Sequence, residues 1–176
     1  SIEEQDYFEL VMETAAKGLR EFMEGKPLSV KIYEMEKPDV PLWCVWAIQQ
    51  YAKEAGKERC RKLYMGLIRD IVDYLLASKH PNLTLDTNGL LYADAKGEAI
   101  TWMNSMNNGQ PVVPRSGYIV EFNALWYNAL RFTAAMEMES GNEERANELD
   151  ALAEKCKVSF VETFLNEYGY LYDYVD

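Results

Sequence analysis

The stretch VEFNALWYNALRFTAAMEME, residues 120–139, decides the fold of this chain because it is apolar on nearly every side. A helix that is apolar all round is buried all round, so this segment predicts an inner helix. The sequence Ser140-Gly141-Asn142 follows it and predicts a tight link. Residues 143–165 then carry a single apolar stripe, which predicts an outer helix with one face in water.

The same pairing of a buried helix with a one-faced helix occurs earlier in the chain. Pro41 opens a helix that is expected to run to residue 55 and that begins with LWCVWAI (42–48), which is apolar on every side. Residues 57–78 carry one apolar stripe opposite charged residues. Gly56 separates the two segments. A further one-faced helix is expected over residues 4–24, ended by Gly25 and Pro27. The predicted order of the helices is therefore outer, inner, outer, inner, outer.

This order predicts an all-α fold: a partial (α/α)6 toroid of alternating inner and outer antiparallel helices with a long irregular loop over residues 79–119. The two tight links run from inner to outer helices, and the long links, 25–40 and 79–119, run from outer to inner helices. Antiparallel alternation places both long links on one face of the ring, where the tail after Leu165 joins them. Function is expected there, because binding residues are often on loops held by rigid elements. A compact five-helix bundle is the alternative.

Five helices cannot close a ring of six hairpins, and two inner helices in an open arc would leave apolar surface in water. We therefore expect residues 1–176 to be one fragment of a toroid domain, or to self-associate.

The charge of the chain narrows the classes of partner. It has 18 basic and 29 acidic residues and a formal net charge of −11, which repels nucleic acid and anionic lipid but not a neutral glucan. No apolar run approaches the ~20 residues of a membrane span.

The three cysteines are spaced too far apart to predict a disulfide scaffold or a zinc site. Free, buried thiols favour a reducing, cytoplasmic location, and neither a metal nor a cofactor is expected.

The most informative motifs lie between residues 86 and 130. They read DTNGLLYA (86–93), ITWMNS (100–105), PVVPRSG (111–117) and VEFNALWYNAL (120–130). This block resembles the amylo-α-1,6-glucosidase domain of glycogen debranching enzymes, whose pattern is close to DGLLYA, LTWMDA and VTPRxGKPVEINALWYNAL. Weaker matches are DVPLW (39–43) with the family's DASLWF, and YLYD (170–173) with its GYLYD. The resemblance extends from about residue 37 to the end.

The resemblance implies an (α/α)6 toroid that hydrolyses α-1,6-glucosidic branch stubs of glycogen or another α-glucan with inversion. Inversion needs a carboxylic acid that protonates the leaving oxygen and a carboxylate base, ~6.5–9.5 Å away, that activates water. The family's base lies further toward the C-terminus and is expected beyond Asp176. We therefore expect residues 1–176 alone to be inactive.

Asn104 departs from the family pattern, in which the acid is the Asp of TWMD. An amide has no transferable proton at neutral pH, although it can hydrogen-bond a sugar. Three explanations are open. The acid has moved to a nearby carboxylate such as Asp94 or Glu98, the protein is a carbohydrate-binding remnant without activity, or the residue was replaced when the polypeptide was made.

Five further residues match family positions and are candidates for substrate binding, although each has a structural alternative. An Asp before a helix is also an ordinary N-cap, and a Glu in a first helical turn also favours the positive helix end by ~0.3–1 kcal/mol. The arginine either braces these carboxylates or binds sugar. The candidates are Asp39, Trp102, Arg115, Glu121 and Asn123.

The aromatic candidates differ in context. Trp102 lies in the long loop and is expected to stack on a glucose ring, whereas Trp43 lies in an apolar helix and favours the core. Asn123 near a helix start is expected to reach the pocket, and Trp126, one turn later, to pack. His80, the only histidine, is expected to be solvated.

The glucosidase interpretation requires Asp39, Trp102, Arg115 and Glu121 to converge on one cavity. The competing interpretations are a glucan-binding remnant, a toroid hydrolase acting on another sugar, and a helical scaffold for protein partners.

Overall fold

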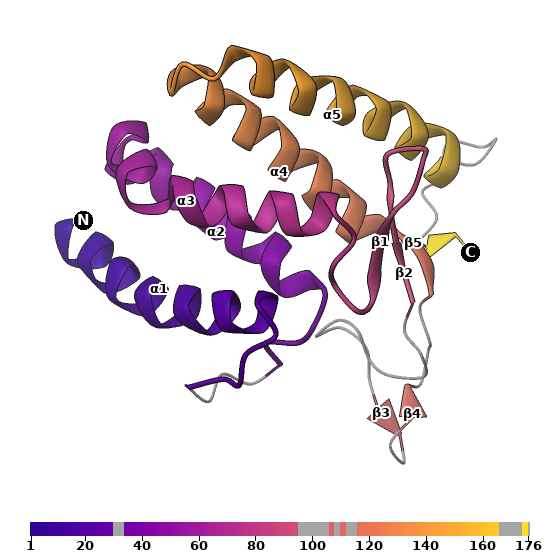
Figure 1. Cartoon of the computed structure of the whole chain (residues 1–176), viewed down its shortest axis with the longest axis horizontal. Helices are drawn as coiled ribbons and strands as arrows, with labels where there is room; N and C mark the ends of the chain where they lie inside the picture. The colour runs from indigo at the N-terminus through magenta and orange to yellow at the C-terminus, as the bar shows by residue number, and fades with distance from the viewer. Residues whose placement is uncertain (30–33, 95–105, 108–109, 112–115, 166–173, 176) are drawn as a thin grey trace.

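The structure is a computed structural model of the chain, and it describes residues 1–29, 34–94, 106–107, 110–111, 116–165 and 174–175. Five α-helices dominate these residues (Figure 1). The predominance of helix predicted from the sequence is confirmed. The helices are α1 (Ile2–Met23), α2 (Asp39–Ala55), α3 (Lys57–Leu76), α4 (Val120–Glu139) and α5 (Glu143–Phe164).

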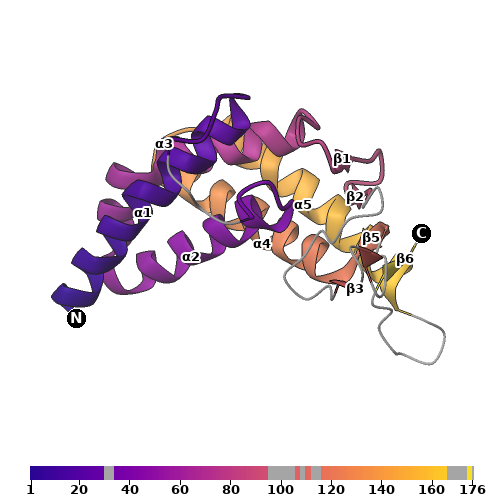
Figure 2. The same ribbon diagram turned by 90° about the horizontal axis from the view of Figure 1, so that it is seen from below.

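The helices form two layers, with α2 and α4 on one side and α1, α3 and α5 on the other (Figure 2). Helix α2 packs against α1, α3 and α4, and α4 also packs against α3 and α5. The alternation of inner and outer helices expected from the sequence is therefore present. No helix within the described part of the chain has both the length and the apolar character needed to cross a bilayer.

Glycines make the two tight links. Gly56 joins α2 to α3 with φ 95°, and Gly141 joins α4 to α5 with φ 83°. A residue with a β-carbon rarely adopts positive φ, so glycine allows the chain to reverse within one or two residues. Both links lie at the same end of the molecule, which we call the turn end (Figure 1).

The opposite end carries a small sheet that was not expected from the sequence. Strands β1 (Leu83–Leu85), β2 (Leu91–Ala93), β5 (Gly117–Ile119) and β6 (Tyr174–Val175) pair in that order, all antiparallel. Two more short strands, β3 (Met106–Asn107) and β4 (Gln110–Pro111), pair with each other. Strands of two or three residues are too short to show an alternating pattern, which explains why the segment read as an irregular loop.

The sheet joins the long link to the tail of the chain. Tyr92 of β2 faces Tyr118 of β5, and Ile119 of β5 faces Tyr174 of β6. The sheet, the start of α4 and the end of α5 thus form one region, which we call the sheet end (Figure 1). The expectation that the tail meets the long link at one end is met for Tyr174 and Val175.

The inner helices are less completely buried than their sequences suggested. Leu42, Val45 and Ile48 of α2 are fully buried, but Trp43 and Trp46 on the same helix are 36% and 42% exposed. The expectation that residues 42–48 are buried on every side is therefore wrong. A helix that packs on only some of its sides keeps one face in water, as expected for an open arc.

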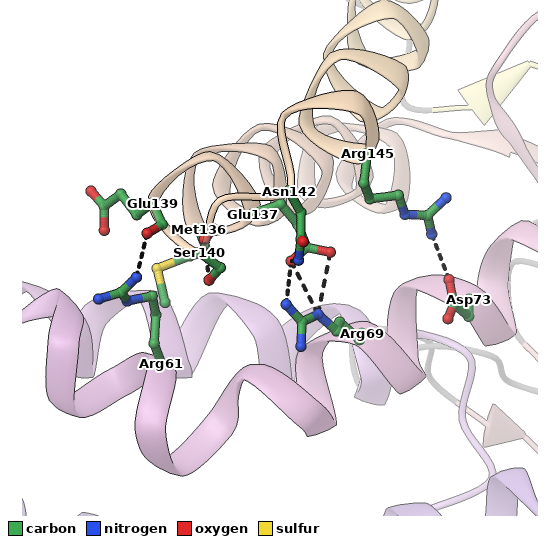
Figure 3. Close-up of polar contacts among 9 residues, drawn as sticks. All are labelled: Arg61, Arg69, Asp73, Met136, Glu137, Glu139, Ser140, Asn142 and Arg145. Carbon is green, nitrogen blue, oxygen red and sulfur yellow. Dashed lines mark hydrogen bonds and ion pairs between the residues drawn. The ribbon is translucent and has the colours of Figure 1, made fainter.

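A polar network ties α3 to the α4–α5 hairpin at the turn end (Figure 3). The guanidinium of Arg69 donates to the Glu137 carboxylate, with Nε–Oε1 and Nε–Oε2 distances of 3.0 and 3.2 Å. Asn142 donates to the same carboxylate at 3.1 Å, and Arg145 pairs with Asp73 at 2.5 Å. The network fixes three helices to one another.

Candidate functional site

A cavity of about 340 Å³ opens between α1, the segment before α2, and the start of α2. Its polar lining comes from Glu34, Lys37 and Asp39, and Trp43 adds an indole ring. We call it the Asp39 cavity. It combines a carboxyl group, an ammonium and an aromatic side chain, which are groups that can hydrogen-bond to and stack on a small polar ligand.

Asp39 is the first residue of α2 and is only 4% exposed. Pro38, not Asp39, is the N-cap residue, so Asp39 does not fill the structural role that its position suggested. Burial raises the pKa of Asp39 to about 6, against the opposing effect of hydrogen bonds from its own backbone and the Trp43 side chain. The negative charges of Glu121 and Glu34 raise this pKa further. Asp39 therefore holds a proton closer to neutral pH than an ordinary aspartate does.

Glu121 lies in the first turn of α4 and is half-buried. Its charge acts on Asp39 because α2 and α4 pack against each other and both helices start toward the sheet end. Glu121 does not line the Asp39 cavity, so the convergence of these two residues on one cavity stays a prediction. The other predicted site residues, Trp102, Asn104 and Arg115, lie outside the described residues.

Asn123 is fully buried and does not lie in the Asp39 cavity. Its amide nitrogen donates to the carbonyls of Leu91 and Ile119, both at 3.1 Å, and its oxygen accepts from the Leu91 amide at 2.7 Å. Both amide hydrogens are used by backbone, so neither is left for a sugar hydroxyl. The expectation that Asn123 binds substrate is replaced by a structural role, in which it fastens β2 and β5 to α4.

Trp126 completes this brace, as its predicted packing role requires. The indole is fully buried and donates to the Gly89 carbonyl at 3.1 Å. Gly89 has φ 88°, and a β-carbon there would lie 3.2 Å from the Cys156 backbone nitrogen. The turn at residues 86–89 is therefore held tightly between α4 and α5. The DTNG turn, which belongs to the motifs between residues 86 and 130, therefore has a structural role and does not line the Asp39 cavity.

The sheet side of the same turn is fixed by Asp86, whose carboxylate accepts a hydrogen bond from the Tyr118 hydroxyl. This bond lowers the pKa of Asp86, and further bonds from Thr87 act in the same direction against a small effect of burial. Asp86 is consequently a charged structural anchor. Asp39 behaves in the opposite way, because its pKa is raised and not lowered.

His80 is buried, which corrects the expectation that it is solvated. Its ring lies between Phe22 and Tyr74, and its Nδ1 accepts a hydrogen bond from the Asn82 amide at 3.0 Å. Burial lowers the pKa of His80 to about 4, although a hydrogen bond with the Glu36 backbone acts in the opposite direction. The sequence could not reveal this position, because the burial depends on helices distant in the chain.

The cysteines and the acidic residues offer no second chemistry in the described part of the chain. Cys44, Cys60 and Cys156 are free, and burial raises the pKa of their thiols to between about 11 and about 12, so they stay protonated and unreactive. Within the described ranges, no group of three or more His, Cys, Asp or Glu side chains is placed to hold a metal ion.

Comparison with known proteins places these features in a family. The model of the amylo-α-1,6-glucosidase family matches residues 31–176, which includes α2 to α5, the sheet and Asp39. No curated protein sequence and no solved structure matches the chain. Since the family match covers well over half of the sequence, the chain belongs to the amylo-α-1,6-glucosidase family.

Proposed function

We propose that this chain is part of a debranching glucosidase that hydrolyses α-1,6-linked glucosyl stubs of glycogen or a related α-glucan with inversion. The observation that carries the proposal is the family match over residues 31–176. The matched range includes helix α2, which starts with a buried, protonatable carboxyl group beside a cavity. The net charge of −11 is compatible with a neutral substrate.

Inverting hydrolysis transfers one proton to the leaving glycosidic oxygen and removes one from the attacking water. Asn104 occupies the position of the family's acid and has no proton to give. Asp39 is a candidate for this task, in addition to Asp94 and Glu98, because its pKa of about 6 keeps it partly protonated near neutral pH. Glu121 is proposed to accept hydrogen bonds from sugar hydroxyl groups, with Trp102 and Arg115 as further substrate contacts.

The proposal includes the architecture around the site. Residues 1–176 form one portion of an (α/α)6 toroid, and the catalytic base comes from sequence beyond Asp176, so these residues alone do not turn over substrate. The two-layer alternation of the helices and the water-exposed tryptophans of α2 support this, because both are expected of an arc cut from a ring. A cytoplasmic location is part of the proposal and rests on the free thiols.

The decisive experiment uses the protein with the sequence that flanks this chain in its natural gene. Glucose release from a phosphorylase limit dextrin is measured, and proton NMR follows the anomer that forms first. The proposal expects β-glucose from the α-1,6 stubs and loss of release in Asp39→Asn, which keeps the shape of the side chain but not its proton. Release of α-glucose, or no release from any α-1,6-linked stub, would refute it.

A second candidate function is glucan binding without hydrolysis, and Asn104 is the observation that favours it. The substitution Asn104→Asp separates the two. If the position still faces a complete site, the variant gains or increases glucose release, whereas a binding remnant retains affinity for the limit dextrin and releases nothing in either form. Asn104→Ala is the matched control, because it also removes the amide but supplies no acid.

A further inference from the structure

A groove opens between α1 and α3, two helices of the same layer (Figure 2). Its volume of about 700 Å³ is larger than that of the Asp39 cavity. All of its lining comes from α1 and α3, so the groove lies on the side of these helices that faces away from the inner helices α2 and α4. We call it the α1–α3 groove.

The open arc does not account for the exposure of this groove. Completing a ring adds hairpins beyond the two ends of the arc, and the surface between two neighbouring outer helices would still face water. Leu10 and Leu63 line the groove and are 65% and 43% exposed. Tyr64 and Leu67 also line it and are buried, so they form an apolar floor. Exposed apolar side chains gathered at such a groove mark a surface that meets another molecule.

Two ion pairs bridge α1 and α3 along the groove. Glu9 of α1 pairs with Arg59 of α3, with an Oε1–Nη2 distance of 2.5 Å, and Arg20 of α1 pairs with Asp70 of α3. The two helices therefore run parallel, and the ion pairs stand about 16 Å apart along α1. Ala16 lines the groove between them, and its small side chain leaves the middle of the groove open.

The charges that line the groove cancel, although the chain as a whole is strongly acidic. Glu9 and Glu13 line it toward the start of α1, and Lys17 and Arg20 line it toward the end. Two carboxylates and two cations give no net charge, against −11 for the whole chain, and the ion-pair partners on α3 add one charge of each sign. Repulsion between two copies of the chain is therefore weakest at this groove.

We infer that the α1–α3 groove is the interface of a twofold homodimer, in which the α1 helices of two copies pack antiparallel. Leu10, Glu13, Lys17 and Arg20 follow helical spacing and share one face of α1. A twofold axis between positions 13 and 17 places Glu13 opposite the partner's Lys17, and Lys17 opposite the partner's Glu13. Leu10 of each copy then enters the groove of the other copy.

The pattern of charges favours a second copy over other partners. A twofold contact uses the same patch on both subunits, so the patch has to complement itself, as this one does. A basic partner would be attracted more strongly by the acidic remainder of the surface, and an acidic partner would be repelled by the chain. A purely apolar partner would leave the exposed charges of Glu13 and Lys17 buried without a counter-charge, which costs free energy. The inference does not depend on the proposed function.

The test measures the oligomeric state of the whole protein, including the sequence that flanks this chain in its natural gene, by sedimentation velocity across the micromolar range. The unaltered protein is expected to dimerise. Glu13→Lys and Lys17→Glu each place like charges opposite one another twice in a dimer, so each is expected to weaken dimerisation by about tenfold or more. Glu162→Lys is the matched control, because it makes the same change of charge at an exposed position of α5. This control is expected to dimerise as the unaltered protein does.

Mixing the two variants tests the antiparallel arrangement itself. In a mixed dimer, both lysines of the Glu13→Lys chain face both glutamates of the Lys17→Glu chain, so dimerisation is expected to return to that of the unaltered protein. Leu10→Ala removes an apolar side chain from each copy and is expected to weaken dimerisation by about tenfold or more, in the mixture as well as in the unaltered protein.

Each outcome decides the inference. A whole protein that stays monomeric overturns it, and so does a dimer that Glu13→Lys and Glu162→Lys affect equally. Weakened dimers that mixing does not restore overturn the antiparallel contact on which the inference stands. Restoration on mixing supports it and shows that both variants are folded. Since the readout does not involve hydrolysis, absence of glucose release would count against the proposed function alone.

Discussion

Two carboxyl groups at opposite ends of the molecule are buried to the same extent and behave in opposite ways. Glu137 at the turn end is 3% exposed, and Asp39 beside the sheet end is 4% exposed. Burial alone would raise the pKa of both. In Glu137, hydrogen bonds from Arg69 and Asn142 outweigh burial and lower the pKa, whereas burial prevails in Asp39 and raises the pKa to about 6.

The partners account for this difference. Glu137 receives a guanidinium and an amide across a helix–helix contact, and the ion pair helps to hold α3 to α4. The charges of Glu121 and Glu34 that act on Asp39 are negative, so its ionised form is disfavoured. A carboxyl group that is buried near negative charges lowers the stability of the fold, and such groups are characteristic of functional sites. Glu137 is therefore a carboxylate that stabilises the fold, whereas Asp39 is the one proposed to serve chemistry.

The largest effect is expected from Asn123→Ala, which tests whether the sheet end is braced by this single amide. The substitution leaves three buried backbone groups of Leu91 and Ile119 without their partner, so we expect a loss of about 3–5 kcal/mol in unfolding free energy. Urea unfolding measures the loss. Hydrogen exchange should show faster exchange of the Leu91 amide, and slow exchange in the variant would contradict the brace.

The next effect is at the turn end. Arg69→Ala leaves the buried Glu137 carboxylate without its cation, and we expect a loss of about 2–4 kcal/mol in unfolding free energy. This loss is below the top of the range for a buried ion pair, because the Arg69 side chain is 41% exposed. Arg145→Ala is the control. It removes an ion pair with Asp73 whose side chains are 36% and 63% exposed, and it should cost under about 1 kcal/mol. Similar losses in both variants would show that the network has no buried centre.

The opposite sign is expected for Asp39→Asn, which should stabilise the fold at pH 8 by about 1–3 kcal/mol, as one pKa unit corresponds to about 1.4 kcal/mol. The folded-state pKa of Asp39, about 6, lies above its usual 3.8, so protonation of this carboxyl group favours the folded state. The stabilising contribution of the proton is full below pH 3.8 and is lost as the pH rises through 6. The gain in the variant should accordingly shrink on acidification and vanish below about pH 4.

Chemical denaturation of both proteins between pH 4 and pH 8 measures this gain. The pKa of His80 is lowered to about 4, so its own contribution falls as the pH drops from 6.5 to 4. That contribution is common to both proteins and cancels in their difference. A variant less stable than the unaltered protein at pH 8 would mean that the Asp39 carboxylate stabilises the fold, as Glu137 does.

The smallest effect concerns Glu121→Gln, which removes one of the negative charges acting on Asp39 and should lower the pKa of Asp39. The shift should be smaller than the effect of burial, which is the larger cause. Carbon-detected NMR titration of the Asp39 carboxyl measures it. Glu34→Gln is the companion variant, and an unchanged pKa of Asp39 in both would show that these two negative charges do not act on it.

The sequence by itself determined the helices and their order. The tight links at Gly56 and Gly141 and the bounds of α4 agree with the sequence prediction, because turns and amphipathic periods are set by neighbours within a few residues. The same local patterns placed the long links at one end and supported the family resemblance. They also placed Asp39 and Glu121 at the starts of inner helices, where the structure has both residues.

Only the tertiary structure decided what each buried group does. Asn123 became a brace because β2 and β5 lie beside α4, and His80 became buried because α1 and α3 end next to it. Trp46 is exposed although its sequence neighbours are apolar. Burial, hydrogen bonds and electric fields come from groups distant in the chain, and no local pattern encodes them. For the same reason, Glu137 and Asp39 look alike in sequence and differ in the fold.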